Sequence, residues 1–352
     1  MPEIPTAVCG LMSDAVICES GGKITYMNPA ASRYLPKVSP GDGLEAVFPP
    51  ENTDGEGEYA FSSEDGLNVS VCPTEGGRVF VFTLPDDGGE VKELCSRLGR
   101  ALRESASVFQ MTFGLVSPRL EELRDRQLET YAAMAERSCY SVLRAAMNIS
   151  RLGELEADEK RGGERVFDLV SLCGDIRDTV SRLVEKKSAK IVFETKEASV
   201  PVSGDPRLIE EAVLNLLSNS LKYTPEDGEI DISVSKKGER AVIRVADTGR
   251  GIPPEIMNSV FTRYGEKTPL DDPKTGLGLG IAVVRQIAVV HGGSVIVGNR
   301  KEGGASVSIL LPIARMPDRF HSGETAYGGI QPILTALSEV LPTECYTPKY
   351  LD

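Results

Sequence analysis

The sequence predicts an α+β fold divided into several domains, and three observations carry this prediction. The first 85 residues contain short strand candidates separated by glycine-rich acidic turns. Residues 91–156 contain almost no glycine or proline, and their apolar side chains recur at helical spacing. Strands and helices then alternate from about residue 165 onward. With 352 residues, of which 41% are apolar, the chain is long enough for about two or three domains.

The composition argues against several classes of protein. A formal net charge of −13 and a pI near 4.9 disfavour nucleic acids and anionic membrane surfaces as partners. No run approaches the roughly 18 to 20 apolar residues that span a bilayer, and residues 1–5 lack the basic and apolar order of a signal peptide. The seven scattered cysteines form no Cys-x-x-Cys pair, which argues against disulfides and zinc. We therefore expect a cytoplasmic protein without membrane insertion.

Residues 1–85 predict a small antiparallel sheet. Its strand candidates are 15–18, 23–27, 59–62, 67–72 and 78–84. The segment 21–31, Gly-Gly-Lys-Ile-Thr-Tyr-Met-Asn-Pro-Ala-Ala, resembles the opening of a PAS sensor domain. No histidine is present there, so a haem bound in the usual way is disfavoured. Two alternatives stay open for this domain: a module that dimerises or relays a signal without a cofactor, and a small-molecule sensor.

Residues 90–158 predict a long helical hairpin. Apolar residues recur at spacings of three and four, and residues 124–127 are the expected turn. The apolar face of such a hairpin is larger than one partner helix covers. We therefore expect a homodimer in which two hairpins form a four-helix bundle. A monomeric hairpin packed on its own neighbours is the alternative.

The first helix of the hairpin contains the segment Phe113-Gly114-Leu115-Val116-Ser117-Pro118. This segment resembles the phosphoacceptor site of sensor histidine kinases, which reads His, an acidic residue, two more residues, Thr or Ser, and Pro. If Ser117-Pro118 is aligned with the end of that site, Phe113 replaces the histidine and Gly114 replaces the acid. Phenylalanine has no lone pair to attack phosphorus, and glycine within a helix costs about 1 kcal/mol relative to alanine. The only histidines are His291 and His321, so autophosphorylation of the hairpin is not expected.

A helix predicted at 206–223 carries a polar face. Glu211, Asn215 and Asn219 are spaced by four residues and therefore share one side. Amide oxygens suit Mg²⁺, for which Asn215 is the candidate ligand, while Glu211 is the candidate catalytic residue that orients or deprotonates a nucleophile. The expected nucleotide contacts of this helix are Asn215, Asn219, Lys222 and Tyr223. Taken alone, the pattern also fits an ordinary solvated helix face.

Two glycine-bearing motifs follow. Residues 245–253 leave an apolar strand, with Asp247 placed to accept a hydrogen bond from the adenine amino group and with Gly249 and Gly251 allowing close approach to the base. Residues 275–280 lead into a helix, so that backbone N–H groups can cradle phosphates. The candidate residues of this second motif are Gly276, Leu277, Gly278 and Gly280. Each motif alone also fits a simple turn or a flexible loop.

The three motifs in this order match the N, G1 and G2 boxes of the ATPase family shared by histidine kinases, gyrase-type enzymes and Hsp90-type chaperones. The resemblance implies an α/β sandwich at 165–313 that binds ATP and Mg²⁺, with a mixed sheet covered by helices on one face. The strand candidates are 190–195, 229–235, 241–246, 294–298 and 305–311. Phe261 and Tyr264 lie where the kinases have an aromatic box, and His291 is expected to be structural.

These features predict a signalling protein similar to sensor histidine kinases, which binds ATP and Mg²⁺ and signals to a response regulator or another kinase. Two alternatives are a kinase acting in trans on Ser, Thr or a partner's His, and a nucleotide-binding switch without catalysis. The tail, residues 314–352, contains an amphipathic segment at 330–341. It could pack on its own domain or on a partner.

Overall fold

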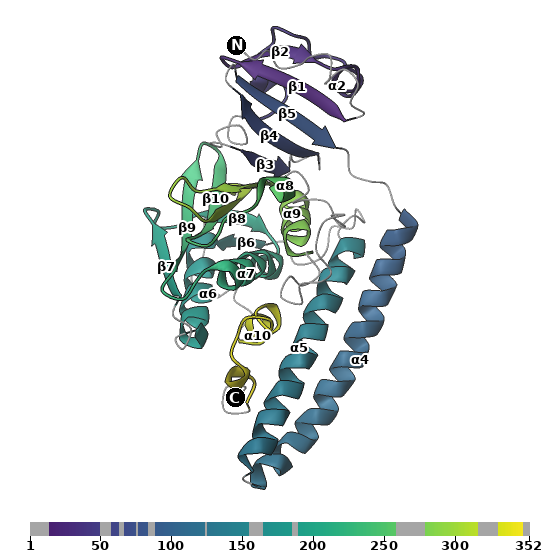
Figure 1. The fold of residues 1–352 in the computed structure, drawn as a ribbon, viewed down its shortest axis with the longest axis vertical. Helices are drawn as coiled ribbons and strands as arrows, with labels where there is room; N and C mark the ends of the chain where they lie inside the picture. Colours follow the sequence, from purple (N-terminus) through teal and green to yellow (C-terminus); the bar gives the residue numbers. More distant parts are fainter. Residues whose placement is uncertain are drawn as a thin grey trace.

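The computed structural model describes residues 14–49, 58–62, 67–74, 77–83, 89–123, 125–154, 165–184, 189–257, 279–315 and 330–347. Figure 1 shows three parts: a small antiparallel sheet, an α/β unit next to it, and a long helical hairpin beside the α/β unit. The fold is α+β, as the sequence predicts. None of the helices among the described residues is long and apolar enough to cross a membrane.

The N-terminal unit is an antiparallel sheet with strand order β2-β1-β5-β4-β3. Its elements are β1 (Ala15–Ser20), β2 (Lys23–Met27), α2 (Pro29–Tyr34), η1 (Leu44–Ala46), β3 (Tyr59–Ser62), β4 (Asn68–Thr74) and β5 (Gly77–Thr83). Asn28 begins α2 by accepting a 2.8 Å hydrogen bond from the Ala31 N–H. The centre of the Phe48 ring lies 5.2 Å from that of Phe61 and 5.5 Å from that of Phe80. The unit therefore has a core of its own, built around these aromatic rings.

The hairpin consists of α4 (Gly89–Glu122) and α5 (Arg126–Glu154), so the second helix begins within the turn predicted at 124–127. Many large apolar side chains of this hairpin are exposed in the single chain. Several of them recur three, four or seven residues apart along α4, which places them on one side of the helix. They are Leu94, Leu98, Val108, Phe109, Met111, Leu115 and Val116 on α4, Leu123 directly after it, and Tyr131, Met134 and Val142 on α5. The four-helix bundle stays a prediction, for which this face is the natural contact surface.

The α/β unit has a mixed sheet with strand order β11-β12-β10-β9-β7, in which only the β7–β9 pair is parallel among the described strands. Its strands are β7 (Lys190–Thr195), β9 (Glu229–Lys237), β10 (Arg240–Asp247), β11 (Ser294–Asn299) and β12 (Ala305–Pro312). Its helices are α6 (Leu169–Val184), α7 (Pro206–Tyr223), α8 (Pro254–Met257) and α9 (Gly280–Val290). Burial alternates along β9 and β10 because the helices cover one face of the sheet. A separate pair, β6 (Arg165–Asp168) and β8 (Pro201–Gly204), was not predicted.

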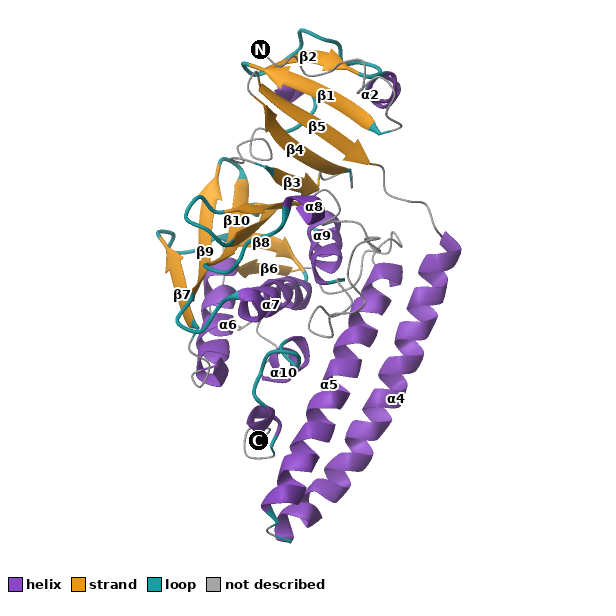
Figure 2. Ribbon diagram, viewed as in Figure 1, coloured by secondary structure: helices purple, strands orange, loops and turns teal. Residues whose placement is uncertain are grey.

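The two sheets are joined into one sheet of ten strands, which the sequence did not predict. The edge strand β3 pairs with β11 in antiparallel register, from Tyr59 opposite Gly298 to Ser62 opposite Val295. Arg285 of α9 strengthens this junction by donating a 2.8 Å hydrogen bond from Nε to Ser62 Oγ. The N-terminal unit thus contacts the helix that follows the predicted phosphate loop. Figure 2 shows the strands continuing from one unit into the next.

The tail folds back onto the same chain. Its described part contains α10 (Ile330–Ala336) and η2 (Thr343–Tyr346). Figure 1 shows this segment between α5 and α7. Of the two arrangements that the sequence left open, the structure has the one in which the tail packs on its own domain.

Candidate functional site

The polar face predicted on α7 lies at the start of α9. Asp205 begins α7 with a side chain that accepts a hydrogen bond from the Arg207 N–H, and Pro206 occupies the first helical position. Asn215 is only 3% exposed, in a helix that is otherwise mostly apolar where it meets the core. Burying an amide costs free energy unless it is hydrogen-bonded, so the buried amide of Asn215 calls for polar partners.

Asn215 presents its oxygen toward α9. Its amide nitrogen donates a 3.1 Å hydrogen bond to the Glu211 carbonyl, one turn earlier in the helix. A Cβ placed on Gly280 would lie 3.6 Å from Asn215 Oδ1 and 3.6 Å from Asn219 Nδ2. Both amides therefore face the first residue of α9, next to the end of the second glycine motif. The structure brings together these three predicted site residues.

Asp247 ends β10 in a buried position beside the last turn of α7. Its Oδ1 accepts hydrogen bonds from the Gly249 N–H at 2.9 Å and the Ala305 N–H at 3.2 Å. Its Oδ2 accepts one from Ser220 Oγ at 3.2 Å. These donors fix the orientation of the carboxylate, as recognition of one edge of a base requires. The remaining lone pairs of Oδ2 are the acceptor that an adenine amino group would need.

The turn after Asp247 is held close to α7 and to the end of β11. A Cβ on Gly249 would lie 2.6 Å from the Tyr223 carbonyl oxygen, so only glycine fits there without movement. Gly251 has a φ of +73°, a conformation that glycine adopts without strain. Asn299 pins the turn by accepting a 2.7 Å hydrogen bond from the Ile252 N–H and donating one of 2.8 Å to the Ile252 carbonyl. The backbone geometry therefore favours glycine at both predicted positions, Gly249 and Gly251.

Two cationic side chains lie near the Tyr223 ring: Lys222 in the last turn of α7 and Arg250 in the loop after Asp247. The Arg250 guanidinium lies 4.8 Å from the centre of the Tyr223 ring, and Lys222 Nζ lies 5.7 Å from the same ring. Lys222 is on the same side of α7 as Asn215 and Asn219, because the three residues are separated by three and four positions. These cations are suited to phosphate, although Lys222 also has a carboxylate neighbour in the tail, Glu339.

The residues present suit a nucleotide with Mg²⁺. Amide oxygens are hard ligands of the kind that Mg²⁺ accepts, and Mg²⁺ needs only one or two protein ligands when phosphates supply others. Asn215 Oδ1 faces Gly280, so that it would meet a ligand lying at the start of α9. Of the second glycine motif, Gly276, Leu277 and Gly278 lie outside the described residues, as do Phe261 and Tyr264.

Glu211 faces the hairpin. Arg151 of α5 donates from Nε to Glu211 Oε2 at 3.0 Å and to Oε1 at 3.3 Å, and its Nη2 lies 3.0 Å from Oε2. Both side chains are largely buried in this contact. The fork of the guanidinium fixes both carboxylate oxygens, which orients Glu211 toward the helices.

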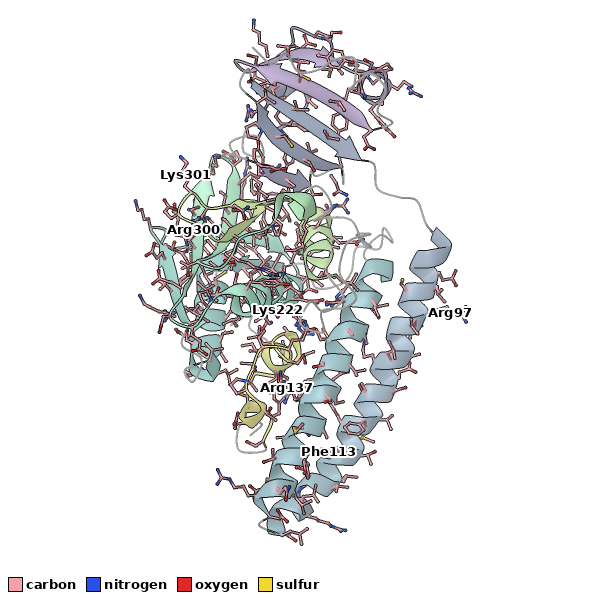
Figure 3. All side chains as sticks on the ribbon, in the orientation of Figure 1. Arg97, Phe113, Arg137, Lys222, Arg300 and Lys301 are labelled. Carbon is pink, nitrogen blue, oxygen red and sulfur yellow. The ribbon has the colours of Figure 1, made fainter. Side chains whose placement is uncertain are left out.

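Phe113 lies on α4 in a stacked pair, with its ring centre 5.6 Å from that of Phe109. Figure 3 places Phe113 near the lower end of the hairpin, well away from Lys222. A Cβ on Gly114 would meet nothing within 4 Å. Packing in the single chain therefore does not require glycine at that position.

His291 links α9 to α7. Its Nε2 accepts a 3.0 Å hydrogen bond from the Asp205 N–H, and its Nδ1 lies 2.7 Å from the Ile287 carbonyl oxygen. One ring nitrogen accepts while the other donates, which corresponds to a neutral imidazole. These contacts fit the structural role that the sequence suggested.

Sequence reasoning missed Arg151, Ser220, Asn299 and Glu339 as neighbours of the site. Ser220 follows a predicted site residue, and its position in a buried helix was a usable signal. Arg151 and Glu339 come from segments 60 positions before Glu211 and 117 positions after Lys222. Their contacts depend on how the hairpin and the tail pack, which local patterns do not reveal.

Part of the α/β unit matches a known family of ATPases. Residues 204–315 match the family described as "Histidine kinase-, DNA gyrase B-, and HSP90-like ATPase". The match covers β10, β11, β12, α7 and α9, and it includes every predicted site residue.

Two curated proteins to which this chain is similar are sensor kinases. The chain is 29% identical over 203 residues to the adaptive-response sensory kinase SasA of Gloeothece citriformis, covering 56% of this chain and 50% of that protein. It is 28% identical over 242 residues to the sensor protein kinase PmrB of Pseudomonas aeruginosa, covering 63% of this chain and 50% of that protein. A crystal structure of full-length ShkA in complex with AMPPNP is 21% identical, has a TM-score of 0.49 and aligns over 62% of this chain and 46% of its own. The chain is similar to sensor kinases of the histidine kinase type, and it spans about half the length of these two curated relatives.

Proposed function

We propose that this protein binds ATP with Mg²⁺ and relays a signal in two-component-type transduction, without autophosphorylation of a histidine in its hairpin. The observation that supports this most directly is the buried Asn215, whose amide oxygen faces the start of α9 beside Asn219. An ordinary solvated helix face has no reason to bury an amide next to a glycine motif.

Each residue of the pocket has a role in this proposal. Asp247 accepts the adenine amino group, while Gly249 and Gly251 let the base approach the backbone. Asn215 and the nucleotide phosphates hold Mg²⁺, which when bound neutralises phosphate charge. Asn219, Lys222 and Tyr223 complete the cofactor contacts, and Gly276, Leu277, Gly278 and Gly280 cradle the phosphates. Glu211 orients the group that attacks.

The other parts supply input and assembly. The N-terminal unit acts as a PAS-like input domain. The hairpin forms a homodimer through the exposed apolar face of α4 and α5, because most of the exposed large apolar side chains of the described chain gather there. A response regulator or another kinase receives the signal.

A second candidate is phosphotransfer in trans to Ser, Thr or a partner's His. The arrangement of Glu211 favours it, since this residue is present although Phe113 offers no acceptor in the hairpin. In this structure Arg151 holds both carboxylate oxygens of Glu211 in a largely buried ion pair, so an external acceptor would have to displace Arg151 before Glu211 could orient its hydroxyl or imidazole.

One experiment separates these functions. The purified protein is incubated with Mg²⁺ and ATP labelled on the γ-phosphate, alone and with a candidate partner protein, and the label is followed in protein and in free phosphate. Label on the partner that is lost in Asn215→Ala and reduced in Glu211→Ala supports transfer in trans. Nucleotide binding with no labelled protein and no free phosphate supports a switch without catalysis. If ATP at millimolar concentration does not bind, the proposal is wrong.

A further inference from the structure

The tail fills a site between the ATPase unit and the hairpin. Ile333, Leu334 and Leu337 are fully buried and belong to the same core cluster as the residues of α6, α7 and α9. Tyr346 closes the segment, with its hydroxyl donating a 2.9 Å hydrogen bond to the Leu334 carbonyl. Such extensive burial of apolar side chains is a large favourable contribution to folding. The tail is therefore an integral part of the fold rather than a loose end.

The tail also makes specific contacts with helix α5 of the hairpin. Arg137 of α5 donates from Nε to the Ser338 carbonyl at 2.9 Å and from Nη2 to the Glu339 carbonyl at 3.2 Å. The Tyr140 ring lies 5.3 Å from the Tyr346 ring, and its hydroxyl donates a 2.6 Å hydrogen bond to Gln331 Oε1. The tail thus joins α5 to the ATPase unit.

Glu339 of the tail contacts both the hairpin and the proposed nucleotide site. Its Oε2 lies 3.3 Å from Arg144 Nη1 of α5 and 3.6 Å from Lys222 Nζ of α7. Arg144 is only 8% exposed. Burial lowers the pKa of its guanidinium, and the Glu339 carboxylate acts in the opposite direction. One carboxylate therefore links a buried cation of the hairpin to the lysine that we assign to phosphate.

We infer that the tail is an autoinhibitory latch, in which Glu339 competes with the nucleotide phosphates for Lys222 and holds the ATPase unit against the hairpin. The inference rests on the proposed ATP site. A triphosphate beside Lys222 repels the Glu339 carboxylate, so nucleotide and latch oppose each other. Linkage makes the effect reciprocal: the factor by which the closed latch weakens nucleotide binding equals the factor by which nucleotide weakens the latch.

The test compares Glu339→Gln with Glu344→Gln, since Glu344 is an exposed residue of the same tail segment. Glutamine keeps an oxygen that can accept from Arg144 while it removes the charge, and thermal unfolding checks that both variants fold. The dissociation constant for Mg·ATP is measured by calorimetry. We expect Glu339→Gln to bind about fivefold more tightly, at the lower end of coupling between sites because Glu339 is partly exposed. Glu344→Gln should match the wild type.

A second measurement keeps the inference falsifiable if Glu339→Gln is unstable. Backbone hydrogen exchange of residues 330–347 in the wild-type protein should become faster when Mg·ATP is added. If Mg·ATP binds but neither its affinity in Glu339→Gln nor the exchange of the tail changes in this direction, the latch is wrong and the proposed function stands. If neither wild type nor Glu339→Gln binds Mg·ATP, both are wrong.

Discussion

In the proposed function α7 holds the nucleotide and α4 is the helix that resembles the phosphoacceptor helix of histidine kinases, and the two helices differ in the side chains they carry. The α7 helix has Glu211, Asn215 and Asn219 on one side, with Asn215 directed at the start of α9. The α4 helix has Phe113 and Gly114 where the family pattern has an acceptor and its acid. If the proposed function holds, nucleotide binding and the acceptor of the phosphoryl group are separable parts. Substitutions on the two helices should therefore affect different properties.

The largest effect is expected on α7. Asn215→Ala removes the candidate Mg²⁺ ligand and should lower any Mg-dependent turnover of ATP at least about 100-fold, because even residues that only support a metal ligand are worth roughly 10-fold to 100-fold. Release of labelled phosphate measures it. The exposed Arg207 on the same helix supplies the control, with turnover of Arg207→Ala close to that of the wild type. Equal turnover in Asn215→Ala and wild type would remove α7 from the mechanism.

A change on the exposed face of α4 should affect assembly instead. Leu115 is 74% exposed in the single chain. In a symmetric dimer Leu115→Glu replaces two apolar contacts by two charges, so we expect the dimer dissociation constant to rise roughly 30-fold. Analytical ultracentrifugation measures this constant, and calorimetry should show unchanged affinity for Mg·ATP. A wild-type chain that is monomeric at all concentrations would contradict the predicted four-helix bundle.

A substitution at Asp247 should weaken recognition of the adenine base. Asp247→Asn replaces a charged acceptor by a neutral one, which should weaken Mg·ATP binding about tenfold. Asp227→Asn is the matched control, because Asp227 is exposed and asparagine tolerates its φ of +55°. Calorimetry of both variants checks the fold-change. An unchanged affinity in Asp247→Asn would mean that the base is recognised elsewhere.

The smallest effect on ATP turnover is expected at Phe113, the residue that we align with the phosphoacceptor histidine. Phe113→Ala should leave the turnover of ATP within about twofold of the wild type, because a partly exposed side chain far from the pocket seldom contributes more. The labelled-phosphate assay used for Asn215→Ala measures it. A large loss would indicate that Phe113 has a function in the chemistry, and the contrast between α4 and α7 would fail.

The sequence predicted the elements of this fold that have strong local signals. Asp205 and Pro206 mark the start of α7, and the alternation of burial along β10 follows its apolar pattern. The three motifs likewise singled out Asn215, Asn219 and Asp247 through their spacing and the residues around them. Their packing against Gly280, Gly249 and Ser220 agrees with those expectations, whereas their roles as ligands remain proposals.

Contacts between distant segments were beyond the reach of local patterns. The four-residue strands β6 and β8 were missed although the equally short β3 was predicted, and they pair with each other across the intervening α6 and β7. Arg151 is one of many arginines in a helical stretch, and nothing near it points to Glu211. Glu339 lies in a segment whose apolar face was recognised, but amphipathicity does not name the partner. These residues acquire their meaning only from the packing of the hairpin and tail.

The pairing of β3 with β11 has a consequence for how the protein can be dissected. Unpaired strand edges present backbone donors and acceptors that recruit strands from other molecules. In the intact chain Tyr59–Ser62 covers β11 along its register with Val295 to Gly298. An ATPase fragment expressed without its N-terminal unit uncovers this edge. Such a fragment should aggregate by strand addition, so the N-terminal unit would also protect the ATPase unit against self-association.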